Sequence, residues 1–136
     1  MKIKLTRIND DLALRAANQH NQSIDLDASP DVGGQNLGMR PMELLASALA
    51  SCSSIDVLLI MKKKRIILKH FEVELEAHRK DAIPAIFESI KLNFIIHQND
   101  PIELVQHAVK LSIEKYCSVA ASLSPDIIIS HEIKRK

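Results

Sequence analysis

The stretch PMELLASALASCSSIDVLLIMKKKR, residues 41–65, decides the fold of this chain. After Pro41 it contains no glycine or proline, and it is apolar on nearly every helical face, which predicts a helix buried on several sides. Pro41 suits the first helical turn, and the basic run Lys62–Arg65 complements the dipole at the other end. This helix would be roughly 36 Å long. We therefore expect it to form the central axis and to leave some apolar surface for another chain to cover.

The residues before this helix predict a three-stranded antiparallel meander followed by a loop. Alternating side chains indicate short strands over residues 2–8, 12–17 and 23–27. All three glycines lie within residues 28–41, a segment too poor in apolar residues to form a regular element.

The residues after the helix predict a β-hairpin, a second helix and a final strand. Alternation is clearest over Phe71–His78, and residues 87–96 form its expected partner strand. Asp100 and Pro101 suit the N-cap and the first position of a helix, which we expect to carry Cys117 in its last turn. Residues 127–133 alternate again. The order of elements predicts an α+β fold, and the length of 136 residues predicts a single domain over residues 1–136.

Composition and charge exclude several classes of function. A net charge of +1 and an aromatic content of 3% argue against nucleic-acid binding. The first residues lack the pattern of a secretory signal. The apolar region of the long helix contains Glu43, Asp56 and several serines, which argues against a membrane span. We therefore expect a soluble, cytoplasmic protein.

Two cysteines, Cys52 and Cys117, are the residues best able to carry chemistry. Each could be a buried side chain that acts as a small hydrophobe. Both have small polar neighbours, however, and a pair of thiols in the cytoplasm is sufficient for a peroxide-reducing cycle. No CxxC motif is present, and no two histidines have helical metal-ligand spacing, so we expect no metal and no cofactor.

The segments ELLASALASCSSIDV (residues 43–57) and KYCSVA (residues 115–120), in this element order, resemble the OsmC/Ohr family of osmotically inducible and organic hydroperoxide resistance proteins. The resemblance is greatest to the OsmC-like redox protein branch. It implies an intertwined homodimer in which the long helices pack centrally and the thiols lie near the dimer interface. It further implies a thiol-dependent, peroxiredoxin-like peroxidase that reduces organic hydroperoxides in oxidative-stress defence. Cys52 would be the peroxidatic thiol and Cys117 the resolving thiol, and a cellular dithiol would reduce the disulfide.

Hydroperoxide reductases of this family also place a glutamate and an arginine beside the first cysteine. Met42 stands at the position of that glutamate, and Glu43 follows one residue later, a rotation of about 100° on a helix. Glu43 is thus a candidate site residue, and the alternative is a first-turn carboxylate that the helix dipole stabilises. Arg40 is the first candidate for the arginine and Arg15 the second. The alternative function is a dimeric stress or small-ligand-binding protein with little turnover.

Overall fold

The computed structural model describes residues 1–136, which form two compact units, Met1–Leu45 and Ala46–Lys136. The predicted α+β class is confirmed: a long helix separates two three-stranded sheets in the sequence, and the later helices lie between the last two strands of the second sheet. The single-domain organisation expected from the chain length stays a prediction.

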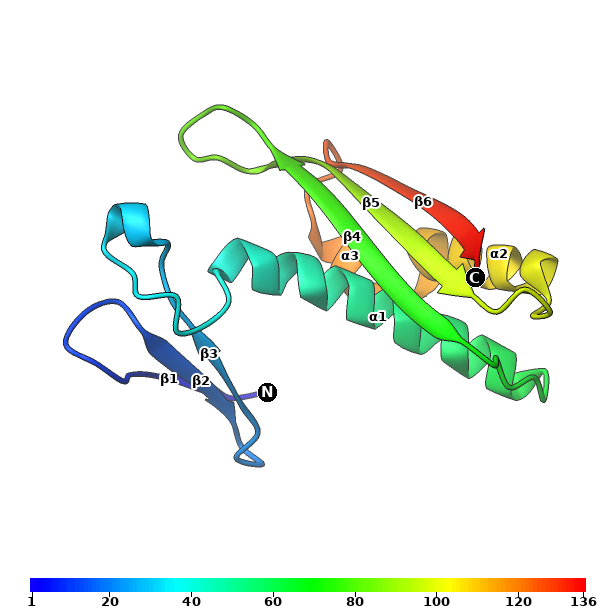
Figure 1. Ribbon diagram of the computed structural model, residues 1–136, viewed down its shortest axis with the longest axis horizontal. Helices are drawn as coiled ribbons and strands as arrows, with labels where there is room; N and C mark the ends of the chain where they lie inside the picture. Colours follow the sequence, from blue (N-terminus) through cyan, green and yellow to red (C-terminus); the bar gives the residue numbers. More distant parts are fainter. The chain divides into compact units, whose positions relative to one another are not determined.

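The first unit contains the predicted antiparallel meander, with β1 (Ile3–Arg7), β2 (Leu14–Asn18) and β3 (Ser23–Leu26) in that order across the sheet (Figure 1). The following loop contains one short 3-10 helix, Pro30–Val32, which ends at Gly33. Gly33 has a φ of 97°, in the left-handed region that glycine adopts most readily. Helix α1 (Pro41–Lys63) begins where the sequence predicts.

A buried carboxylate organises the loop of the first unit. Asp27 is 2% exposed, and its side chain accepts hydrogen bonds from the backbone N–H groups of Ala28, Gln35 and Leu37. The bonds from Leu37 and Gln35 are the main reason why the pKa of Asp27 is lowered. The Asp27 carboxylate therefore accepts backbone hydrogen bonds that regular secondary structure would otherwise accept in this loop.

The second unit is built on a mixed sheet in which β5 (Phe87–Ile96) is the central strand. Strand β4 (Phe71–Arg79) pairs with it antiparallel, which confirms the predicted hairpin, and β6 (Ile128–Arg135) adds to its other edge in parallel (Figure 1). The core forms where this sheet packs against α1 and α2 (Ile102–Leu111). Its fully buried side chains include Leu49, Val57, Met61, Ile90, Leu92, Phe94, Ile96, Val105, Ala108 and Val109.

The end of the second helix differs from the prediction. Cys117 does not lie in the last turn of α2, because α2 ends at Leu111 and is followed by one π-helical turn, Ser112–Tyr116. The wider turn is closed by a hydrogen bond of 2.8 Å from the Cys117 N–H to the Ser112 carbonyl. Cys117 is then extended and precedes a short helix, α3 (Ser118–Ser122). The thiol therefore stands at a junction between two helices.

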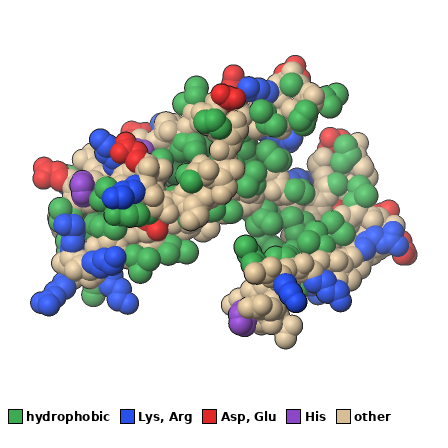
Figure 2. All heavy atoms as spheres, turned by 180° about the vertical axis from the view of Figure 1, so that it is seen from behind, with side chains coloured by type: hydrophobic (Ala, Val, Ile, Leu, Met, Phe, Trp, Pro, Cys, Tyr) green, Lys and Arg blue, Asp and Glu red, His purple; other side chains and the backbone are tan.

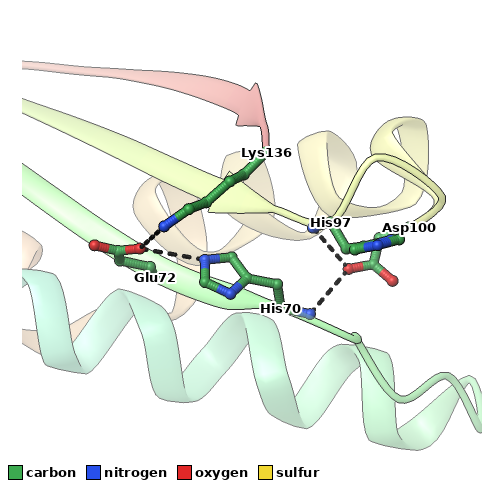
Figure 3. A network of polar contacts seen from close by, with 5 residues as sticks. All are labelled: His70, Glu72, His97, Asp100 and Lys136. Atoms are coloured by element: carbon green, nitrogen blue, oxygen red, sulfur yellow. Dashed lines mark hydrogen bonds and ion pairs between the residues drawn. The ribbon is translucent and has the colours of Figure 1, made fainter.

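The prediction that Asp100 caps α2 is also wrong. The helix begins at Ile102 and has no side-chain cap. The Asp100 carboxylate is buried and accepts from the backbone N–H groups of Lys69, His70 and His97. Figure 3 shows the bonds from His70 and His97. The carboxylate thus accepts three N–H groups from two segments, more hydrogen bonds than a single helix N-terminus would give it. Asp100 thus ties the start of β4 to the end of β5.

Helix α1 is buried on fewer sides than its sequence suggests. Within the second unit, Ile55, Leu58 and Leu59 remain 57%, 43% and 49% exposed. Hydrophobic side chains form extended patches on the face shown in Figure 2. By length and composition α1 could cross a membrane, and 28% of its most apolar window is buried, but the core helix of a soluble protein can meet the same criteria. The exposed apolar residues indicate a surface that requires cover.

Candidate functional site

The two cysteines and one carboxylate meet in the second unit. The sulfur atoms of Cys52 and Cys117 and a carboxylate oxygen of Asp56 all lie within 4.8 Å of one another. Cys52 and Asp56 are four residues apart on α1, a spacing that places two side chains on the same helical face. Cys117 approaches them from the junction that follows the π-helical turn. The expected proximity of the two thiols is confirmed.

The Asp56 carboxylate is held in place by a buried hydroxyl. Ser112, which is 0% exposed, donates a hydrogen bond of 2.8 Å from its Oγ to Oδ2 of Asp56. Ser112 is also the residue whose carbonyl accepts from the Cys117 N–H. The π-helical turn therefore positions both the carboxylate and the second thiol through one residue.

The two thiols differ in their access to solvent. Cys52 is half-buried, whereas Cys117 is 2% exposed. Burial raises the pKa of the Cys117 thiol to about 11, and the neighbouring Cys52 sulfur adds to the rise, while the N–H groups of Ala120 and Val119 oppose it. Cys117 is therefore a protonated thiol at neutral pH, and Cys52 is the thiol that a solute can reach.

The serines around Cys52 do not donate to its sulfur. The hydroxyl of Ser51 donates to the carbonyl of Ala48, and those of Ser53 and Ser54 also donate to helix carbonyls one turn earlier. The polar neighbours that distinguish this segment of sequence are thus bonded to their own helix. Asp56 is the polar side chain that the second unit brings to the thiols.

The other predicted site residues make contacts within the first unit. The Arg40 guanidinium donates to the side chain of Asn36 and to the Gly38 carbonyl, and the Arg40 N–H donates to Oε2 of Glu43 at 2.9 Å. Glu43 thereby caps the first turn of α1, as its helix-dipole interpretation expects. The catalytic roles of Arg40 and Glu43 stay predictions.

Arg15, the second arginine candidate, is bonded to a neighbouring strand. Its guanidinium forms a two-pronged ion pair with Asp25, at 2.6 and 2.8 Å. The hydrogen bond and charge of Asp25 raise the pKa of Arg15. Its role beside a thiol also stays a prediction.

Sequence reasoning missed Asp56 and Ser112 as parts of the site. The signal for Asp56 was its i, i+4 spacing from Cys52, which is visible in the sequence. No comparable signal marked Ser112, because its contact with Asp56 depends on the π-helical turn, which a regular helical period does not predict.

The fold and the site define a class of small α+β proteins that hold an accessible thiol beside a buried one. The sequence model of the family described as OsmC-like protein matches residues 33–132. The chain belongs to this family. It is 41% identical over 92 residues to Protein YhfA of Escherichia coli strain K12, a match that covers 67% of this chain and 69% of that protein.

Solved structures share the whole fold. A hypothetical protein from Aquifex aeolicus VF5 is 31% identical, with a TM-score of 0.80 over 99% of this chain and 96% of the other. An organic hydroperoxide resistance protein OsmC from Legionella pneumophila is 13% identical, with a TM-score of 0.72 over 98% of this chain and 97% of the other. The second likeness, at 13% identity, concerns the fold alone.

Proposed function

We propose that the protein is a thiol-dependent reductase of organic hydroperoxides that acts in oxidative-stress defence through Cys52 and Cys117. One observation carries the proposal. The two sulfur atoms lie within 4.8 Å of each other, one accessible and one buried, so that each can take a different role. Membership of the OsmC-like family supports a redox role for such a pair.

The proposed cycle begins at the accessible thiol. The Cys52 sulfur attacks the outer oxygen of the hydroperoxide, the O–O bond breaks, and an alcohol leaves with Cys52 as a sulfenic acid. The Cys117 sulfur then attacks the Cys52 sulfur, which forms the disulfide and releases water. A cellular dithiol reduces this disulfide by exchange and is itself oxidised. A disulfide has an S–S distance of about 2.05 Å, so the two sulfur atoms, which lie within 4.8 Å, would move closer when it forms.

A nearby cation would favour the thiolate form of Cys52. Arg40 is the proposed source and Arg15 the second, with Glu43 as a positioning carboxylate. Arg40→Ala should slow alkylation of Cys52 by iodoacetamide at neutral pH, with little effect on folding. Unchanged alkylation in both Arg40→Ala and Arg15→Ala would remove arginine activation from the proposal.

The active form is proposed to be an intertwined homodimer. Ile55, Leu58 and Leu59 present one exposed apolar face of α1, and Ile3 and Leu5 of the first sheet are also more than half exposed. A soluble protein seldom leaves patches of this extent uncovered. Sedimentation at micromolar concentration should give twice the chain mass, whereas a stable monomer would contradict the dimer. We place the protein in the cytoplasm, where thiols are kept reduced.

Turnover tests the proposed function directly. Cumene hydroperoxide should be consumed in the presence of excess dithiothreitol by the wild-type protein and not by Cys52→Ser. Cys117→Ser should react once and accumulate a sulfenic acid that dimedone traps. Wild-type protein that binds hydroperoxide without consuming it would overturn the reductase and favour the ligand-binding alternative.

A further inference from the structure

We propose that the reduced protein binds one divalent zinc ion between Cys52, Cys117 and Asp56. These residues offer two sulfur atoms and one carboxylate oxygen, all within 4.8 Å of one another, from two separate segments of the fold. Cysteine sulfur and carboxylate oxygen are both common zinc ligands. The proposal departs from the expectation of no metal, which considered only CxxC motifs and histidine pairs.

The spacing of the three ligand atoms suits a tetrahedral ion. Zn–S bonds of about 2.3 Å and Zn–O bonds of about 2.1 Å place neighbouring tetrahedral ligands roughly 3.4 to 3.8 Å apart. The present atoms, within 4.8 Å of one another, would have to approach by at most about 1.4 Å, which side-chain rotations provide. Calcium and magnesium, which require six or more oxygen ligands, do not fit this set.

The surroundings supply a fixed second ligand shell and an open coordination position. Ser112 donates to Oδ2 of Asp56 at 2.8 Å, which orients the carboxylate as a second-shell hydrogen bond does for a metal ligand. Asp56 also lines a surface cavity of about 530 Å³ together with Tyr116 and Lys63. Neither cysteine lines this cavity, but Cys52 is only half-buried, so solvent water can occupy the fourth position.

Zinc binding and disulfide formation exclude each other, because both use the same two sulfur atoms. When zinc binds, each thiol loses its proton to the solvent, and the two thiolates and the carboxylate coordinate the ion. No electrons are exchanged in this step. The metal-bound form should therefore be protected from alkylation and from peroxide, and the oxidised form should not bind the metal.

Zinc titration of the full-length reduced protein, with a chromophoric indicator as competitor, tests the site. We expect one ion per chain. Asp56→Asn keeps the size of the side chain and should weaken binding by at least about tenfold. Cys52→Ser and Cys117→Ser should each weaken it further, and Asp126→Asn, an exposed change elsewhere on the surface, should have no effect. Cobalt should give the visible spectrum of a tetrahedral thiolate site, which a loosely bound surface ion does not produce.

Two results would overturn the proposal. Equal zinc affinity in wild-type protein and both cysteine variants would show that the thiols are not ligands, and equal affinity in Asp56→Asn would remove the carboxylate. Circular dichroism of each variant verifies folding, so that weaker binding is read only from folded protein. The site does not depend on peroxidase activity, because the titration is performed without peroxide and the serine variants cannot form the disulfide.

Discussion

The two units of the chain are stabilised in different ways. The second unit buries a continuous apolar core between its sheet and helices, with Leu92, Phe94 and Val105 each at 0% exposure. The first unit buries few apolar side chains, while Ile3 and Leu5 of β1 are 52% and 58% exposed. A three-stranded sheet needs a covered hydrophobic face to be stable in water.

This difference shows where the site can be rigid and where the proposed partner chain would bind. The thiols and Asp56 lie in the unit that has its own core, so their geometry is set by close packing. The first unit depends on the Asp27 carboxylate to hold its loop and leaves its sheet face available. The candidate arginines lie in that first unit, whose exposed sheet also belongs to the surface that the proposed dimer would cover.

Removal of a core side chain from the second unit should have the largest effect. Phe94 is 0% exposed, and its ring centroid lies 6.1 Å from that of Phe71. Phe94→Ala should lower the free energy of unfolding by about 3–5 kcal/mol. The control is Leu5→Ala in the first unit, which should change it by less than about 1 kcal/mol when measured in urea at low protein concentration. Equal losses would contradict the contrast between the units.

Loss of the Asp100 carboxylate should have the next largest effect. Asp100→Ala leaves the N–H groups of Lys69, His70 and His97 without their acceptor, and should lower the free energy of unfolding by about 2–3 kcal/mol. Asp100→Asn retains one acceptor oxygen and should lose less. If both variants unfold at the wild-type urea concentration, the carboxylate does not join β4 to β5.

Acidification should weaken both units through their buried aspartates. Burial alone would raise the pKa of Asp100, but hydrogen bonds from the backbone N–H groups of Lys69, His70 and His97 outweigh this effect, so its pKa is lowered. Hydrogen bonds from Leu37 and Gln35 likewise lower the pKa of Asp27. Because each folded pKa lies below the unfolded value of about 3.9, the stabilisation is complete above that pH and is lost as the pH falls through the folded pKa. Thermal melts between pH 6 and pH 2 should show this loss, which Asp27→Asn combined with Asp100→Asn should reduce. If the double variant loses as much thermal stability on acidification as the wild-type protein, other titrating groups cause the loss.

The smallest effect is expected at the ion pair of the first sheet. Arg15 and Asp25 are bonded at 2.6 Å, but the arginine side chain is 52% exposed, and solvent screens such pairs strongly. Arg15→Ala should leave the urea midpoint unchanged within experimental error. A clear loss of stability would mean that this surface is buried in the assembled protein, which would strengthen the dimer.

The sequence predicted the regular elements well because their signals are local. The strands around Val73 and Leu92 follow from alternation, and the helix from Pro41 follows from a long apolar stretch without internal glycine or proline. The pairing of the final strand needed the structure, since alternation does not reveal which edge a strand joins or in which direction. The position of Cys117 could not be predicted, because a single π-helical turn shifts every later residue away from the helical period.

The site was predictable only in part. Cys52 and Cys117 were identified from their residue type and from family resemblance, and their proximity is confirmed. Asp56 was assigned only to the polar character of the helix, although it lies one turn from Cys52. Asp100 was predicted to cap α2, but its carboxylate accepts from Lys69, about 30 positions earlier in the sequence, and from His97 in the adjacent turn.

The central claim, that Cys52 and Cys117 form a redox pair, is tested most directly by intact-mass measurement after one equivalent of cumene hydroperoxide. The reduced wild-type chain should lose two hydrogens, and peptide mapping should locate the disulfide between these two cysteines. Cys117→Ser should instead gain one oxygen. A wild-type chain of unchanged mass, under conditions in which iodoacetamide labels Cys52 readily, would contradict the account.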